Sequence, residues 1–402
     1  MGNSADDDRF GITGRWTLTN AANDFSGNIT VSVGMLEFTN LKTGVETTSS
    51  MGDLSATRTI TLGSNNFNGR RYDIFGNTDQ LSDQGFSQGT NTTAPVGDVG
   101  TIIFNDAGSG TATFGTNISW SFVNTTTTNT TGAQLINNGN KRIVINGTFA
   151  TNTTGTHNLV LDGSNTLSND LHSNLANPAT SQTTSVIKEG SGTWRLSGTN
   201  TFTGAAIINN GTLELAGGAA IADSATVALN ADGGDGFFSG TARVRFINSE
   251  TIGLLTGDIF TEAEILSGQT LTIAAGNSTM NGLITGDGNL SRLILSGSTA
   301  GTLTSSASNT YTGITTIGAT GAATANAGMT IYQIADGGVA SGLGKSSNAA
   351  SNLVFATTTA GTNGGTLIWA GFTNQRTDRL FTIGLGAAGA AIAASVTVVG
   401  TT

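Results

Sequence analysis

Residues 192–215 read GTWRLSGTNTFTGAAIINNGTLEL, and this stretch decides the fold. Apolar side chains alternate with polar ones in TWRL at residues 193–196 and again in GTLEL at residues 211–215. A period of two is typical of β-strands that bury one face. Between them, NTFTG at residues 200–204 supplies turn chemistry, because Asn and Gly both tolerate the left-handed backbone region. The stretch therefore predicts strand, turn and strand.

The same pattern occurs twice more along the chain. Residues 14–38, GRWTLTNAANDFSGNITVSVGMLEF, superpose on it with one extra residue before Asn23. Residues 286–318 contain a stretched third copy, in which Leu-Ser-Gly is followed, after a short insertion, by NTYTG. Self-similarity of this kind predicts stacked units of similar structure. Six Asn-Gly steps mark further tight turns, at Asn68, Asn138, Asn146, Asn210, Asn281 and Asn363.

The composition of the whole chain favours the same structure. Of 402 residues, 58 are Gly, 69 Thr and 38 Asn, together about 41%, and only 10% are charged. These three residue types are poor helix formers, which argues against a helical or α/β enzyme. The 37% of hydrophobic residues can form a core, which argues against disorder. We therefore predict an all-β protein made of many short strands.

Irregular spacing of the copies selects among all-β architectures. The interval from Trp16 to Trp194 is far longer than the interval from Leu196 to Leu295, so the regular blades of a propeller do not fit. A sandwich of this length would need several domains, and no Pro-rich or charged linker divides the chain. A solenoid tolerates insertions because each coil contacts only its neighbours. We predict one elongated right-handed parallel β-solenoid (β-helix) over residues 1–402, with roughly 20–25 residues per coil.

The repeat also resembles a known family. Residues 190–218, GSGTWRLSGTNTFTGAAIINNGTLELAGG, resemble the autotransporter-associated β-strand repeat of long secreted bacterial β-helix passengers. Residues 14–38 resemble a second copy, and residues 286–313 resemble the glycine-rich opening that leads into Leu-Ser-Gly. Residues 376–395 are similar to segments between such repeats. The resemblance implies a β-helix at the bacterial cell surface or outside the cell, and it brings no catalytic residues.

Charge and cysteine content exclude several classes of partner. The net charge of −10 has the wrong sign for binding phosphates, so we expect no nucleic-acid partner. The most apolar stretch, residues 385–400, is rich in Gly, Ala, Ser and Thr and predicts no membrane span. With no cysteine, thiolate metal sites and cysteine nucleophiles are absent. We predict no catalytic residue, no cofactor and no metal.

The residues that could carry chemistry are few. His157 lies in a predicted strand start and His172 in a polar turn, and we expect both to be solvated or to cap turns. No Gly-x-Ser-x-Gly, P-loop or His-Glu-x-x-His motif accompanies them. A loop at residues 231–240 resembles a calcium-binding nonapeptide, but Phe238 replaces the expected Asp, so a glycine-rich turn is favoured. Ten Asn-x-Ser/Thr sequons, including those at Asn124, Asn129 and Asn152, are potential glycan acceptors.

Paired carboxylates need a separate check, because two positioned acids can cleave glycosidic bonds. Glu262 and Glu264 are separated by a single residue, so both would lie on one face of a strand. Asp378 lies between Arg376 and Arg379. Neither group is accompanied by a contiguous acidic and aromatic cleft pattern, so we interpret both as exposed strand-face charges.

Two structural expectations follow from the strand pattern. Residues 380–402 contain no Pro and no charge, and the unprotected small-residue strand 390–400 would present open backbone groups for end-to-end stacking with a second copy. Leucines at period-two positions should point into the core, namely Leu18, Leu36, Leu196, Leu213, Leu215, Leu293 and Leu295.

Three functional hypotheses remain open. The first is a structural extracellular β-solenoid, acting as a surface stalk or as a self-assembling filament subunit of a bacterium. The second is an adhesin passenger that binds surface glycans through exposed Thr, Asn and aromatic side chains. The third, less favoured, is a β-helix enzyme that cleaves polysaccharides.

Overall fold

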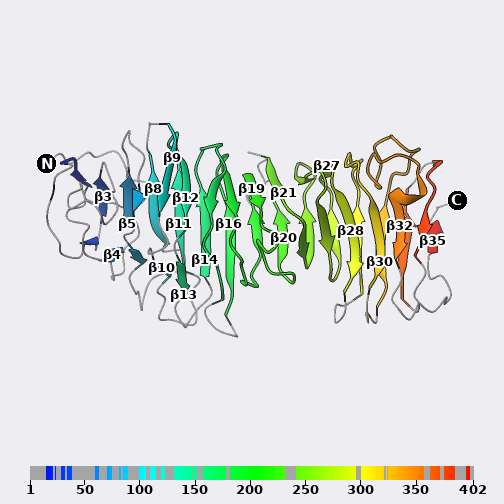
Figure 1. The fold of residues 1–402 in the computed structure, drawn as a ribbon, viewed down its shortest axis with the longest axis horizontal. Coiled ribbons are helices and arrows are strands. Elements are labelled where there is room, and N and C mark those ends of the chain that lie inside the picture. Colours follow the sequence, from blue (N-terminus) through cyan, green and yellow to red (C-terminus); the bar gives the residue numbers. More distant parts are fainter. Residues whose placement is uncertain are drawn as a thin grey trace. The chain divides into compact units, whose positions relative to one another are not determined.

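The protein is all-β. Its computed structural model describes residues 15–20, 23, 29–31, 34–38, 59–62, 70–74, 81–82, 85–88, 99–105, 109–114, 119–122, 131–146, 148–151, 157–177, 182–230, 241–295, 300–320, 323, 325–356, 363–371, 375–384 and 395–398. Within these residues the only helical element is one 3₁₀ turn, η2 (Ala350–Asn352). Strands of successive coils pair in parallel, as Figure 1 shows, which confirms the predicted parallel β-solenoid. No helix in the described residues is long and apolar enough to cross a membrane.

The chain divides into two compact units, Met1–Gly204 and Ala205–Thr402, and each is described by itself. That one solenoid continues through both units stays a prediction.

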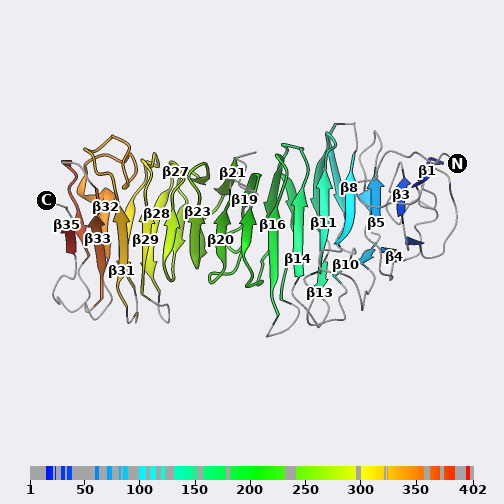
Figure 2. The same ribbon diagram turned by 180° about the vertical axis from the view of Figure 1, so that it is seen from behind.

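The described strands of unit 1 form three parallel sheets, and strands of the first sheet are visible in Figure 2. The first sheet comprises β1 (Arg15–Leu18), β3 (Gly34–Phe38), β5 (Arg70–Ile74), β8 (Val99–Phe104), β11 (Thr131–Asn137), β14 (His157–Asp162) and β16 (Thr184–Lys188). The second comprises β2 (Ile29–Val31), β4 (Thr59–Leu62), β7 (Gly85–Gln88), β10 (Ser119–Phe122) and β13 (Thr148–Thr151). The third comprises β6 (Leu81–Ser82), β9 (Thr111–Phe114), β12 (Arg142–Ile145), β15 (Asn169–Leu171) and β17 (Thr193–Leu196).

In unit 2 the strands that the structure describes also form three parallel sheets. The first comprises β18 (Ala206–Ile208), β20 (Thr226–Leu229), β23 (Leu254–Gly257), β26 (Ser278–Met280), β29 (Gly301–Ser305), β31 (Ala327–Ile331), β33 (Gly365–Trp369) and β35 (Ser395–Val398). The second comprises β19 (Gly211–Leu215), β21 (Ala242–Phe246), β24 (Glu262–Ile265) and β27 (Leu283–Gly286). The third comprises β22 (Glu250–Ile252), β25 (Thr270–Ile273), β28 (Asn289–Ile294), β30 (Thr315–Ala319), β32 (Leu353–Ala356) and β34 (Thr382–Ile383).

Coil length varies more than the sequence repeat predicts. Arg15 pairs with Met35 in the next coil, whereas Ala327 pairs with Gly365, so one turn of the chain is nearly twice as long in the second case. The prediction of roughly 20–25 residues per coil is therefore wrong for some coils, which are longer than its upper bound. The coil that begins at Ala327 carries an excursion between β31 and β32, orange in Figure 1. Insertions at the corners of a solenoid leave the stacked strands undisturbed.

The core follows the predicted alternation where the repeat is regular. Leu36, Leu196, Leu213 and Leu215 are buried, which confirms four of the seven core leucines. Leu18 is only half-buried, in a strand that pairs with β3 along one edge and has no second partner among the described strands.

The prediction for the third repeat copy is wrong by one residue. Leu293 and Leu295 are half-exposed, because Leu290, Arg292 and Ile294 take the inward positions of β28. A shift of one residue moves every side chain of a strand to the other face.

The asparagine side chain of the Asn-x-aromatic-x-Gly motif forms a hydrogen bond to the backbone of the preceding coil. The Oδ1 atom of Asn200 accepts a hydrogen bond of 2.7 Å from the backbone N–H of Leu175, 25 residues earlier. The Oδ1 atom of Asn309 accepts one of 2.9 Å from the N–H of Ile284, also 25 residues earlier. Both asparagines are buried, so each satisfies a backbone donor that would otherwise be orphaned at a corner.

The aromatic and glycine positions of the motif complete the same contact. Phe202 and Tyr311 are fully buried. A Cβ atom at Gly204 would lie 2.2 Å from the carbonyl oxygen of Thr184, and one at Gly313 would lie 2.1 Å from that of Gly288. Only glycine allows the backbones of adjacent coils to approach this closely. The motif is thus a stacking device, in which the asparagine and the glycine contact the preceding coil and the aromatic ring fills the core.

Candidate functional site

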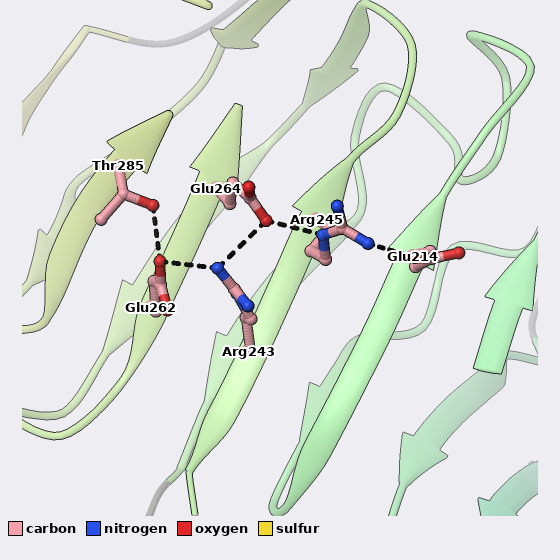
Figure 3. Close-up of polar contacts among 6 residues, drawn as sticks. All are labelled: Glu214, Arg243, Arg245, Glu262, Glu264 and Thr285. Atoms are coloured by element: carbon pink, nitrogen blue, oxygen red, sulfur yellow. Dashed lines mark hydrogen bonds and ion pairs between the residues drawn. The ribbon is translucent and has the colours of Figure 1, made fainter. Parts of the chain in front are cut away.

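Charged side chains are gathered on the outer face of the second sheet of unit 2. The inward positions of β21 and β24 are apolar, so Arg243, Arg245, Glu262 and Glu264 point outward. The strand register places Arg243 opposite Glu262, and Arg245 opposite both Glu264 and Glu214 of β19. Figure 3 shows these five side chains as a continuous row, which we call the arginine–glutamate ladder.

Every member of the ladder is ion-paired. Arg245 donates from Nε to Glu264 Oε2 at 2.6 Å and from Nη1 to Glu214 Oε1 at 2.6 Å. The Nη2 atom of Arg243 lies 3.1 Å from Glu264 Oε2 and 3.0 Å from Glu262 Oε1. Alternation of sign along the stacking direction makes each charge attractive to its neighbours in the next coil.

The side chains of the ladder differ in burial, and burial and ion pairing together shift the pKa of Arg245. The side chain of Glu214 is 2% exposed, whereas that of Arg245 is 31% exposed. Burial lowers the pKa of Arg245, but the hydrogen bond and charge of Glu264, together with Glu214, outweigh burial and leave the pKa above its usual value. At the other end Thr285 of β27 donates from Oγ1 to Glu262 Oε1 at 2.6 Å.

The geometry bears directly on the predicted carboxylate pair. Glu262 and Glu264 lie on one face of β24, as their spacing predicts. Both accept hydrogen bonds from arginine, however, and this arrangement suits a structural ion pair better than a proton donor to a glycosidic oxygen. No sequence signal could reveal the pairing, because Arg243 is 19 residues from Glu262 and Glu214 is 31 residues from Arg245.

The second predicted acidic group is an anchor for the excursion between β31 and β32. Asp378 is exposed and accepts hydrogen bonds from the Gly337 N–H at 2.7 Å and from Asn348 Nδ2 at 3.0 Å. The Gly337 N–H is the main reason that the pKa of the Asp378 carboxyl lies below its usual value. Arg376 is exposed, and the structure buries Arg379 instead.

Arg379 is buried and donates hydrogen bonds to several groups of the same excursion. Its Nε donates to the Ala335 carbonyl at 3.2 Å and its Nη1 to Ser346 Oγ at 2.8 Å. Its Nη2 donates to the carbonyls of Val339 at 3.2 Å and Gly344 at 3.0 Å. Burial lowers the pKa of this arginine. The expectation of an exposed charge is therefore wrong for Arg379, which ties a loop together through its carbonyl groups.

The two histidines lie in different environments. His157 is fully buried at the start of β14, so the expectation that it is solvated is wrong. His172 is exposed, and its Nδ1 lies 2.9 Å from Ser197 Oγ. Ser197 donates to Asp170 Oδ1 at 2.5 Å, and Asp170 pairs with Arg142 at 3.1 Å. In this group the serine, not the histidine, bridges the other two, so the histidine is not placed as the base of a hydrolytic triad.

Further charged side chains are buried at positions that sequence patterning did not single out, and burial shifts the pKa of Lys188, Arg292 and Glu250. Lys188 and Arg292 are buried in units 1 and 2, respectively, and burial lowers the pKa of Lys188 to about 8 and that of Arg292 to about 10. Glu250 is 3% exposed, and burial raises its pKa to about 7. Hydrophobic periodicity could not find them, because it assigns inward positions to apolar residues.

Several sequence candidates lie outside the described residues. These are the loop at 231–240 with Phe238, and the sequon asparagines Asn124, Asn129 and Asn152. Among the residues that the structure does describe, no three or more His, Asp or Glu side chains gather as a metal site would require.

Comparison with known protein families identifies two segments of the chain as repeats. Residues 13–38 and 186–215 match the passenger-associated-transport-repeat family. The chain carries two passenger repeats. The first segment contains β1, β2 and β3, and the second runs from within β16 to the end of β19. The match confirms the resemblance to autotransporter passengers at these two segments, while the third copy near 286–318 stays a prediction. The chain matches no curated protein and no solved structure.

Proposed function

We propose that this protein is a surface-exposed bacterial passenger whose β-solenoid serves as a structural stalk. The observation that carries the proposal is the use of the repeat residues. Asn200 binds the backbone of the preceding coil, Phe202 is buried and Gly204 allows close approach of two coils. A repeat whose distinctive side chains all serve stacking supports a mechanical role. Passenger repeats of this family are typically structural, and they imply secretion to the surface.

The surface location can be tested on intact cells. Bacteria that produce the full chain are treated with an external protease, and the protein is followed with an antibody. Stalk function predicts loss of the protein from intact cells, while a cytoplasmic marker is spared. Protection of the protein until the cells are lysed would refute a surface role.

We further propose that the stalk associates end to end. The strand β35 pairs with β33 along one edge, and the structure describes no strand on its other edge. Unpaired backbone groups of such an edge accept another strand. Negative-stain microscopy of the purified chain should show rods that lengthen as concentration rises. Lysines at Val396 and Val398 should abolish lengthening, whereas filaments of unchanged length in that variant would refute the idea.

A glycan-binding adhesin is the second candidate function. It is favoured by exposed large apolar side chains next to the arginine–glutamate ladder, which include Ile259, Phe260 and Leu283. Enzymatic cleavage of polysaccharides receives no comparable support, because the candidate acids Glu262 and Glu264 are engaged with arginine.

A further inference from the structure

Trp16 has an unusual exposure for a residue of the passenger repeat. It is 60% exposed, whereas Trp194, which takes the same place in the second repeat, is fully buried. Trp16 is the register partner of the buried Leu36, so it lies on the core side of β1. The strand β1 ends its sheet among the described strands. Trp16 is therefore a core residue at an edge that a further strand can cover.

The second repeat shows what covers this tryptophan inside a stack. Trp194 lies opposite Asn169 of β15, a strand of the preceding coil that runs parallel to β17. Its Nε1 atom donates to the Asp162 carbonyl at 2.8 Å, also from an earlier coil. By analogy within the repeat, the edge of β1 suits a parallel strand that comes before it in a stack. Such a strand needs a free edge on its own following side.

The edge of β1 is already ordered. Residues 15–18 pair with residues 35–38 along their whole length. Thr17 Oγ1 also donates to Glu37 Oε2 at 2.8 Å, which ties β1 to β3. A strand held in this way can pair along its second edge at little cost in conformational entropy.

The strand β35 has the complementary edge. It pairs with β33, and among the described strands it ends the first sheet of unit 2. Val396 is the register partner of the buried Leu367, and Val398 is that of Trp369. Residues 380–402 carry no charge, so this segment adds no like-charge repulsion between two copies whose net charge is −10 each.

A further apolar group lies in the last described coil of unit 2. Phe381 packs against the buried Phe355 of the preceding coil, with the ring centroids 5.7 Å apart, and it is still 49% exposed. The adjacent strand β34 ends the third sheet of unit 2 among the described strands. This coil therefore has apolar surface beside its open edges that a further coil would bury.

We propose that β35 of one copy pairs in parallel with β1 of a second copy, head to tail. Both strands have four residues, and one register places Val396 beside Trp16 and Val398 beside Leu18. A shift of one residue would set the valines beside polar residues of β1, so the apolar pattern selects this register. The inference rests on the end-to-end association proposed above, and it adds which edge receives β35.

Head-to-tail pairing differs from a symmetric alternative, in which β35 pairs with β35 of a second copy. A contact between two different surfaces leaves one free edge of each kind in the assembly, so further copies can be added. A symmetric contact uses β35 of both copies and stops at a dimer. The two arrangements therefore predict different behaviour when one edge is blocked.

Blocking each edge of the purified full chain separately tests the proposal. Trp16→Lys blocks β1, and Val396→Lys/Val398→Lys blocks β35. Sedimentation velocity should show wild-type assemblies that lengthen with concentration, and each variant alone should associate at least about tenfold more weakly, as loss of a central anchor does. An equimolar mixture of the two variants should form dimers and nothing larger, because one intact β35 meets one intact β1.

Leu167 provides a matched control in unit 1. It is 45% exposed, so Leu167→Lys introduces the same charge at an apolar surface position that is not part of β1. This variant should assemble as the wild type does. Trp16→Phe keeps an aromatic ring and should retain most of the association. Circular dichroism melts should show that all variants are folded.

The outcomes separate this inference from the proposed function. Dimers of the Trp16→Lys variant alone would overturn head-to-tail pairing but leave end-to-end association through β35 intact. A mixture that forms no dimers, or wild-type assembly by Trp16→Lys, would also overturn head-to-tail pairing. A wild-type chain that stays monomeric at every concentration would refute both this inference and end-to-end association, whereas the surface location of the stalk is tested separately by protease treatment of cells.

Discussion

Glu250 should make the stability of the protein depend on pH in a defined window. Its side chain is 3% exposed at the start of β22. Its carboxyl oxygens accept hydrogen bonds from the N–H groups of Ala220 at 3.3 Å and Ile221 at 3.2 Å. Burial raises the pKa of Glu250 to about 7, the two N–H groups oppose this rise, and the nearby Asp223 adds to it. The carboxyl group is therefore protonated in the folded protein at pH values where it is ionised in the unfolded chain.

The sign follows from proton linkage. Between the unfolded pKa of 4.5 and the folded pKa of about 7, the folded state holds a proton that the unfolded state releases. Stability from this group is fully present below pH 4.5 and is lost as pH rises through 7. The gap between the two pKa values corresponds to about 3 kcal/mol, which partial hydration of the site reduces to about 2–3 kcal/mol.

The variant Glu250→Gln does not titrate at this position, so the change of the wild-type-minus-variant difference with pH isolates this contribution. The amide nitrogen of glutamine cannot accept the second backbone N–H, which adds a cost to the variant that does not depend on pH. In urea unfolding, the stability of the wild type relative to the variant should fall by about 2–3 kcal/mol between pH 4.5 and pH 8. Asp287→Asn makes the same carboxylate-to-amide change at an exposed position and serves as the control. A wild-type-minus-variant difference that stays constant from pH 4.5 to 8 would contradict the argument.

Three further predictions concern stability, all measured by urea unfolding. Leu213→Ala should cost about 2–5 kcal/mol, since Leu213 is fully buried, and a cost below about 1 kcal/mol would place it outside the core. Arg245→Ala should cost about 1–3 kcal/mol, because the buried carboxylate of Glu214 loses its ion pair with Arg245. The added change Glu214→Gln should recover most of that loss, and no recovery would mean that Arg245 acts through packing alone. Gly313→Ala should destabilise by about 1–3 kcal/mol through its clash with the Gly288 carbonyl, whereas Gly338→Ala, with no atom nearby, should cost only the strain of its positive φ.

The fold could be predicted from the sequence because the repeat encodes it locally. Alternation in TWRL and GTLEL predicts inward Trp194, Leu196, Leu213 and Leu215, and all four are fully buried. The turn residues of the motif were also found, although their role was not. That Asn200 reaches the Leu175 N–H in the preceding coil is a property of the stack, and no short window of sequence contains both residues.

The failure in β28 has a specific physical cause. Hydrophobic period favours Leu293 and Leu295 as inward residues, yet the strand turns Arg292 inward. Arg292 is fully buried because its Nη1 donates to the Ile273 carbonyl at 2.7 Å and its Nη2 to the Gly276 carbonyl at 2.8 Å. These carbonyls belong to the preceding coil, so the favourable burial of this guanidinium depends on partners that the pattern of one strand cannot supply.

The contacts of the candidate site could not be predicted for the same reason, because they also join side chains of neighbouring coils. Sequence period tells which side chains face outward, but neighbours on the outer face are set by coil length, which differs widely between the coil of β1 and that of β31. The pairing of Glu264 with two arginines of the previous coil was therefore unpredictable.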